Sequence, residues 1–269
     1  MLKTRMLTGA LITVVMCLIV MFSHIPWLLR IIIACFGSQA VFELYKATYL
    51  KDNKLLLNGS FLLIILISIL PLPYDQMIVG GIFSAAIILF IYLIKNTKQL
   101  SSVQPWISCF VALMIAFSFK CLSGIRNMDN GFYILATAIL AGTVTDIAAY
   151  FIGKGFGKHK LAPIVSPKKT VEGSVGGTIC TVVILSALAA LLQASGALTV
   201  NFGILMCYLL LASAIGQFGD LAFSSIKRIV GIKDYGRLLP GHGGVLDRFD
   251  SLIFILPFTY LFCCCFAFC

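Results

Sequence analysis

The chain has 269 residues, of which 60% are hydrophobic and only 11% are charged, and its mean hydropathy is +1.04. Because a soluble domain usually carries about 25% charged residues, this composition excludes an ordinary soluble protein. The net charge of +10 comes without an RNA-binding motif or a zinc finger. We therefore interpret it as basic loops beside anionic lipid headgroups and not as a nucleic-acid interface.

Nine apolar stretches are long enough to cross a membrane, for which about 20 mostly apolar residues are needed. In chain order they are residues 6–22, 27–45, 55–70, 77–94, 106–122, 132–152, 174–192, 204–223 and 252–268. We predict an all-α, polytopic integral membrane bundle of about nine transmembrane helices that forms one membrane domain. Residues 1–130 are expected to be scaffold, and residues 131–269 are expected to carry the chemistry and the cytoplasmic loops.

The basic residues alternate between the two sides of this predicted bundle. Seventeen of the twenty Lys and Arg fall in loops on the side of the N-terminus, and the other three are Arg30, Lys120 and Arg126. Since Lys and Arg concentrate in cytoplasmic loops, the basic loops and the N-terminus are expected in the cytoplasm. The compact chain, without a long polar N-terminal extension, favours a bacterial inner membrane.

The first concentrated polar region begins with Asp146, inside the sixth apolar stretch. An ionisable residue at membrane depth is costly and is therefore a functional candidate. Glycines then alternate with lysines over residues 153–158, in an expected loop, and residues 166–170 read Ser-Pro-Lys-Lys-Thr. The glycine pattern follows no predicted strand, which argues against a P-loop or a dinucleotide site. A plain basic cytoplasmic loop is the alternative, and Thr170 or Ser174 is expected to cap the next helix.

The second polar region, residues 224–250, is dense in cations, carboxylates and glycines. Such cations suit a polyphosphate, and the glycines allow a ligand to approach the backbone N–H groups closely. Carboxylates beside phosphate-binding cations are how Mg²⁺ is usually held. The alternative is that these charges only pair with one another at an interface.

Helical spacing groups several of these polar residues. Asp220 lies near the end of the preceding apolar stretch, and it shares one helix stripe with Ser224 and Lys227. Asp247 and Asp250 are three residues apart, so they share a face if a helix begins there. The ends of the sixth, eighth and ninth predicted helices are therefore expected to form one polar site.

The motifs of these two regions closely resemble those of the phosphatidate cytidylyltransferases, also called CDP-diacylglycerol synthases. The second region carries the family's SxIKR, KDxG and LPxHGGVxDRFD elements, and the first carries AAYFxGKxFGKHKL and SPKKTxEG. The resemblance is specific over residues 146–250. Over residues 1–130 it extends only to the general architecture of apolar helices.

The resemblance implies a reaction in which CTP and phosphatidic acid give CDP-diacylglycerol and pyrophosphate, with Mg²⁺ required. It also implies an all-helical membrane bundle, often a homodimer, with a polar cavity open to the cytoplasm and membrane lipids around it. The residues implied as catalytic are Asp220, Asp247, Asp250, Lys227 and Arg248, and those implied as metal ligands are Asp220, Asp247 and Asp146. The residues implied in substrate binding are Ser166, Lys168, Lys169, Thr170, Ser224, Arg228, Lys233, His242, Gly243 and Gly244.

Three other functions stay open at this point. A transferase that consumes CDP-diacylglycerol is expected to show an Asp-Gly-x-x-Ala-Arg element, which the sequence lacks. A transporter for an anionic solute is expected to repeat discontinuous helices in both halves, and no such repeat is visible. A relative that activates another lipid phosphate, such as a polyprenol phosphate, would share most of the same motifs.

Overall fold

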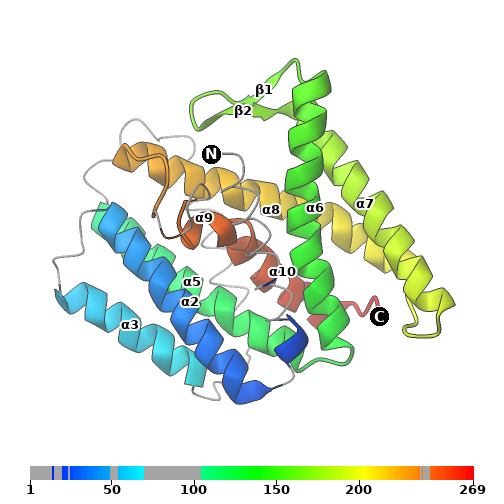
Figure 1. Cartoon of the computed structure of the whole chain (residues 1–269), viewed down its shortest axis with the longest axis horizontal. Coiled ribbons are helices and arrows are strands. Elements are labelled where there is room, and N and C mark those ends of the chain that lie inside the picture. Colours follow the sequence, from blue (N-terminus) through cyan, green and yellow to red (C-terminus); the bar gives the residue numbers. More distant parts are fainter. Residues whose placement is uncertain are drawn as a thin grey trace.

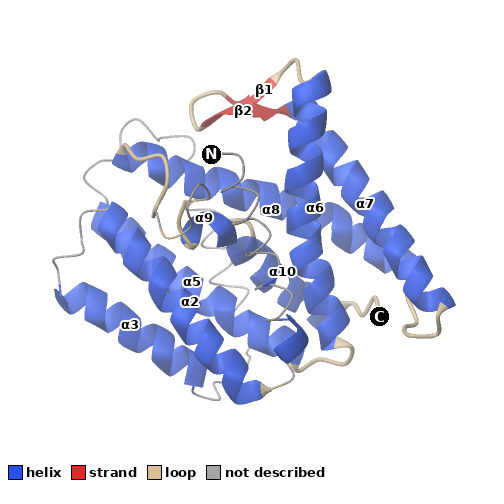
Figure 2. Ribbon diagram, in the orientation of Figure 1, coloured by secondary structure: helices blue, strands red, loops and turns tan. Residues whose placement is uncertain are grey.

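The computed structural model describes residues 25–48, 54–69, 104–236 and 243–269, with residues 14, 20–23 and 238 besides. These residues form a helical bundle to which one short β-hairpin is added (Figure 2). The elements are α2 (Pro26–Ala47), α3 (Lys54–Ile69), α5 (Gln104–Arg126), α6 (Gly131–Phe156), β1 (Lys160–Ala162), β2 (Ser166–Thr170), α7 (Val171–Ala194), α8 (Phe202–Val230), α9 (Leu246–Phe249) and α10 (Leu252–Cys265). In Figure 1, α2, α3 and α5 lie together on one side and α6 and α7 on the other, with α10 packed against both α5 and α8.

Seven of the nine predicted spans coincide with helices α2, α3, α5, α6, α7, α8 and α10. The predicted span 77–94, and most of the predicted span 6–22, lie outside the described residues. Within the described residues, five helical segments are long and apolar enough to cross a membrane, namely Pro26–Ala47, Gly131–Phe156, Val171–Ala194, Phe202–Val230 and Leu246–Cys265. The protein is therefore mostly helical with several candidate membrane spans, and the count of nine remains a prediction.

Helices α6 and α7 approach each other closely because small residues line their contact. A Cβ atom on Gly177 would lie 2.9 Å from both the Thr145 carbonyl oxygen and the Ala149 Cβ atom, and one on Gly173 would lie 2.7 Å from the Ala149 carbonyl oxygen. Without a hydrophobic driving force inside lipid, such small residues let helix backbones pack against each other. The hairpin of β1 and β2 connects these two closely packed helices.

The link between α6 and α7 differs from the predicted loop. Helix α6 continues to Phe156, so Gly153 and Gly155 belong to the helix, and the expectation that they lie in a loop was wrong. Strands β1 and β2 then pair in an antiparallel hairpin, which the sequence did not predict because a polar segment containing a proline shows no apolar alternation. The predicted cap is confirmed, since the Thr170 side chain accepts a hydrogen bond from the Gly173 N–H at 3.2 Å.

Hydroxyl and amide groups connect α6, α7 and α8 in the apolar part of the bundle. Thr145 Oγ1 shares hydrogen bonds with Thr181 Oγ1 at 2.8 Å and with Ser213 Oγ at 2.9 Å. Gln217 Nε2 donates to Thr178 Oγ1 at 3.0 Å. Polar groups in lipid-covered bundles need such partners, so the network fixes α6 and α8, which carry Asp146 and Asp220, against α7.

A proline inside α10 creates a second polar link. Pro257 has no N–H, so the Ile253 carbonyl oxygen loses its usual partner four residues along the helix. Ser118 Oγ on α5 donates a hydrogen bond to that oxygen at 2.5 Å. The Ser118 hydroxyl thus satisfies the carbonyl and ties α5 to α10.

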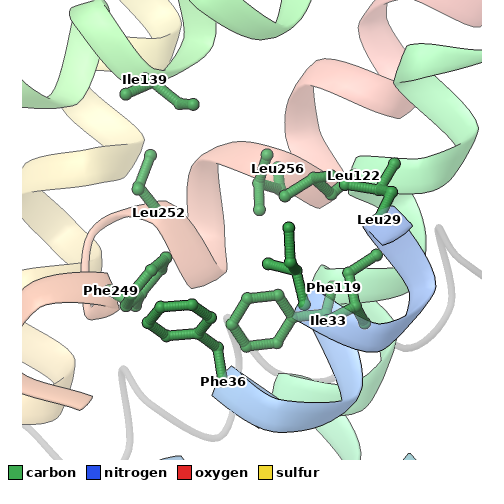
Figure 3. Close-up of a pocket in the computed structure, with 10 residues that line it drawn as sticks. Leu29, Ile33, Phe36, Phe119, Leu122, Ile139, Phe249, Leu252 and Leu256 are labelled. Carbon is green, nitrogen blue, oxygen red and sulfur yellow. The ribbon is translucent and has the colours of Figure 1, made fainter. Parts of the chain in front are cut away.

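An apolar pocket lies where α2, α5 and α6 meet the α9–α10 segment. Figure 3 shows the rings of Phe36, Phe119 and Phe249 around a small pocket whose lining residues are all apolar. The Phe36 and Phe249 ring centroids lie 5.7 Å apart, and those of Phe119 and Phe249 lie 5.6 Å apart. Helix α9 is therefore packed against the N-terminal helices directly beside its polar residues.

Candidate active site

A buried ion pair joins α8 to α9. Lys227, near the end of α8, places its Nζ atom 2.9 Å from Asp247 Oδ1, and the two side chains are only 11% and 3% exposed. The lysine lies above the Tyr235 ring, 5.4 Å from the centroid. Two charges removed from water require good geometry and further hydrogen bonds to be tolerated, so this pair points to a site with a defined arrangement.

Asp247 also organises the glycine-rich segment before α9. Its Oδ2 atom accepts hydrogen bonds from the backbone N–H groups of Tyr235 and Gly244, each at 2.9 Å. Gly243 has a φ of +83°, and a Cβ atom there would lie 2.8 Å from Asp247 Oδ2. The glycine is therefore required both by its left-handed backbone and by the close approach of this carboxylate.

A second ion pair joins the hairpin to α8. Lys169 on β2 pairs through Nζ with Asp220 Oδ2, and the side chains are 26% and 24% exposed. Ser224 Oγ, one turn along α8, donates to Asp220 Oδ1 at 3.3 Å. The Lys169 Nζ atom is itself buried, and Asp220 is the carboxylate with which it forms an ion pair among the described residues.

Asp146 and Asp250 complete the acidic part of the site. Asp146 interacts electrostatically with Asp220 and Arg248, and Asp250 interacts with both Asp146 and Asp220. Asp146 is exposed, whereas Asp250 is 8% exposed and accepts a hydrogen bond from the Ser251 N–H at 2.8 Å. The carboxyl groups of α6, α8 and the α9–α10 segment therefore lie near enough to influence one another electrostatically, and their roles remain predictions.

The donor chemistry of this cluster fits Mg²⁺, which prefers oxygen ligands. No group of three or more His, Cys, Asp or Glu residues within the described parts of the chain converges so as to hold a metal ion by itself. Magnesium is commonly bound by one or two carboxylates together with substrate phosphates, and the accessible carboxylates of Asp146 and Asp220 meet that requirement. The metal-ligand roles of Asp146, Asp220 and Asp247 remain predictions.

The charges of the site therefore pair with one another, as the alternative interpretation proposed, but they also leave cations exposed. Arg228 is exposed and donates from Nε to the Val165 carbonyl oxygen at 3.1 Å, which ties the hairpin turn to the end of α8. The side chains of Lys168, Lys233 and Arg248 are exposed.

Two of the predicted substrate-binding residues take part in structural contacts of the hairpin and of the α7 cap. Ser166 pairs with Ala162 in the hairpin, and Thr170 is buried as the α7 cap. His242 lies outside the described residues. The substrate-binding roles of these residues remain predictions, as do those of the exposed cations.

One buried carboxylate was missed by the sequence analysis. Glu43 on α2 is 2% exposed and accepts a hydrogen bond from the Leu246 N–H, at the start of α9, at 2.9 Å. The signal was present, because Glu43 is an acidic residue inside the apolar stretch 27–45. The same argument that selected Asp146 and Asp220 applies to it.

Comparison with known proteins agrees with this site. A model of the cytidylyltransferase family matches residues 3–266. A phosphatidate cytidylyltransferase of Bacillus subtilis is 38% identical over 96% of both chains, and one of Staphylococcus aureus is 34% identical over 75% of this chain and 76% of its own. A phosphatidate cytidylyltransferase of Staphylococcus haemolyticus is 36% identical over 66% of each chain. The chain belongs to the cytidylyltransferase family.

Proposed function

We propose that the protein is a phosphatidate cytidylyltransferase of phospholipid biosynthesis, a nucleotidyltransferase that transfers CMP from CTP to phosphatidic acid. The products are CDP-diacylglycerol and pyrophosphate. The observation that carries the proposal is the cluster of carboxylates and cations in which Lys169 meets Asp220 and Lys227 meets Asp247 at the junction of membrane helices. The names of relatives that align over nearly the whole chain support the same activity.

The reaction is an in-line substitution at phosphorus. A phosphate oxygen of phosphatidic acid forms a bond to the α-phosphorus of CTP, and the bond from that phosphorus to the bridging oxygen of the β-phosphate breaks. The attacking oxygen is already anionic, so no strong general base is needed. The main obstacles are repulsion between the two anions and the charge that grows on pyrophosphate, which positioning and fixed cations reduce.

The chain offers cations from three places that could reduce this repulsion. Lys169 and Lys168 come from the hairpin, Lys233 follows α8, and Arg248 lies on α9. Lysine and arginine pair strongly with phosphate oxygens, and arginine can bind two of them at once. We expect these residues to hold the triphosphate and the lipid phosphate close together and to keep their mutual repulsion low.

Mg²⁺ is the proposed cofactor, held by Asp146 and Asp220 with the substrate phosphates. Bound there, it would neutralise charge on the phosphate groups and on the departing pyrophosphate. Asp247 carries a further role through its own contacts, because it keeps Lys227 and the backbone of the preceding segment in place. Asp250 adds a buried carboxyl group that interacts with Asp146 and Asp220.

The membrane explains why the site lies where helices end. Phosphatidic acid cannot easily leave the bilayer, and CTP cannot enter it, so the two can meet only at the interface. The basic hairpin and the end of α8 carry lysines and arginines, which favours the cytoplasmic face of a bacterial inner membrane. A homodimer, with lipids around it, is part of the same proposal.

The position of the label in CTP tests the reaction. Purified protein in detergent is supplied with phosphatidic acid, Mg²⁺ and CTP labelled with ³²P at either the α- or the γ-phosphate. The proposal predicts α-label in the lipid phase and γ-label in released pyrophosphate. Lipid that carries the γ-label would indicate a kinase instead, and labelling of a polyprenol phosphate but not of phosphatidic acid would assign another lipid substrate.

A further inference from the structure

Glu43, on α2 of the N-terminal scaffold, contacts the loop that leads to α9. Its carboxylate accepts the Leu246 N–H at 2.9 Å and, through Oε1, a hydrogen bond from Gln39 Nε2 at 3.2 Å. We propose that Glu43 is a positioning residue that fixes the start of α9, and with it Asp247 and Arg248, for CMP transfer. The inference rests on the proposed function for its kinetic consequences.

The two glycines nearest to Glu43 support this role. A Cβ atom on Gly236 would lie 2.6 Å from Glu43 Oε1, and one on Gly244 would lie 2.8 Å from Oε1 and still closer to Oε2. Neither glycine has a positive φ, so the backbone alone does not require glycine at these positions. The space taken by the carboxylate requires it.

Glu43 and Asp247 thus both contact the two ends of one segment, residues 235–246. Asp247 accepts the N–H groups of Tyr235 and Gly244, and Glu43 packs against Gly236 and Gly244. These contacts bring the two ends of the segment 235–246 together.

Packing alone does not require a carboxylate at this position. Helix α2 already contacts α9 through the Phe36 and Phe249 rings, so an apolar residue in place of Glu43 could continue that contact. Burial of a carboxylate costs desolvation free energy, and hydrogen bonds must offset that cost. Its presence between the scaffold and the loop points to a precise position for α9 rather than to stability.

Three variants separate positioning from other roles. Glu43→Gln keeps the shape and an oxygen that can accept the Leu246 N–H, since the Gln39 amide can rotate to match it. Glu43→Ala removes the contact, and Phe42→Ala is the matched control, because Phe42 is the neighbouring residue on α2 with its side chain exposed. We expect Glu43→Ala to lower kcat about 10- to 100-fold, as misplacement of catalytic groups does, whereas Glu43→Gln and Phe42→Ala stay within about threefold of wild type.

A double-mutant cycle tests the contact itself. Gly244→Ala alone drives a methyl group into the Glu43 carboxylate and is expected to lower kcat, whereas the same change in Glu43→Ala finds the space empty. The effects of contacting residues are not additive, so we expect the double variant to be no slower than Glu43→Ala. Should Glu43→Ala not fold, Glu43→Asp, which withdraws the carboxylate by one methylene group, takes its place in the cycle.

The outcomes distinguish this inference from the proposed function. A folded but inactive wild-type protein would contradict the proposed function. The same double-mutant cycle, measured by thermal unfolding, would still test the contact between Glu43 and Gly244. Additive effects in the cycle, or wild-type kcat in Glu43→Ala, would overturn the positioning role. Equal losses in Glu43→Gln and Glu43→Ala would also overturn it, because they would show that the negative charge itself is required.

Discussion

The buried pair of Lys227 and Asp247 allows a quantitative prediction. Both side chains are nearly inaccessible, at 11% and 3%, so removal of one partner leaves the other charge buried without its ion-pair partner. Breaking such a pair costs about 3–5 kcal/mol, which corresponds to a fall in Tm of about 6–20 °C for a chain of this size. Lys227→Met and Asp247→Asn are each expected to lose stability in this range.

Asp247→Ala is expected to be worse than Asp247→Asn. The asparagine keeps an oxygen for the N–H groups of Tyr235 and Gly244, whereas alanine leaves both donors without the acceptor they have at 2.9 Å. Each buried donor left unsatisfied costs about a further 1–3 kcal/mol. The double variant Lys227→Met/Asp247→Asn removes both charges, and replacement of a whole buried pair is often nearly neutral.

Thermal unfolding in one detergent, together with CTP turnover, measures these effects. The expected order of Tm places the double variant above either single variant while its turnover stays lost, since the cation and the carboxylate are both absent. Single variants with wild-type Tm, or losses that simply add in the double variant, would refute the assignment of this pair as a buried, coupled unit.

Three further predictions concern glycine, a helix link and the cofactor. Gly231→Ala and Gly243→Ala both place alanine at a positive φ, but only Gly243 lies against a carboxylate. We expect Gly231→Ala to lose about 1 kcal/mol of stability with normal turnover, and Gly243→Ala to lose turnover. Equal turnover in the two variants would contradict this expectation. Ser118→Ala leaves the Ile253 carbonyl oxygen without its hydrogen bond and should lower the free energy of unfolding by about 1–3 kcal/mol. Ser186 is the control, because its hydroxyl has no partner among the described residues. Ser186→Ala should therefore leave Tm unchanged. Chelation of divalent cations should stop turnover and added Mg²⁺ should restore it, and turnover that persists in excess EDTA would remove Mg²⁺ from the proposal.

The helix positions could be predicted because lipid demands long apolar stretches. The helix ends could not be predicted, because the apolar pattern stops at the edge of the bilayer while a helix can continue beyond it. Helix α8 continues through a basic segment to Val230 and ends at Gly231, whose φ of +76° forms its cap. The hairpin of β1 and β2 is made of polar residues, and no apolar periodicity announces such strands.

The sequence could predict which residues belong to the candidate site better than it could predict their contacts. Asp146 and Asp220 were selected because carboxylates are rare in apolar stretches, and in the structure both interact electrostatically with Asp250. Their partners come from segments distant in sequence, as in the pairing of Lys169 with Asp220. Glu43 satisfied the same criterion, but its partner Leu246 is 203 residues away, so only the fold could reveal its role.

The most direct test of the account is formation of CDP-diacylglycerol by the purified protein and by an Asp220→Asn variant of the same fold and yield. Asp220 is the carboxylate that Lys169 and Ser224 contact, and it belongs to the proposed Mg²⁺ site. The account predicts product from the wild-type protein only when CTP, phosphatidic acid and Mg²⁺ are all present, and none from Asp220→Asn. A folded wild-type protein that forms no product, or an Asp220→Asn variant as active as the wild type, would contradict it.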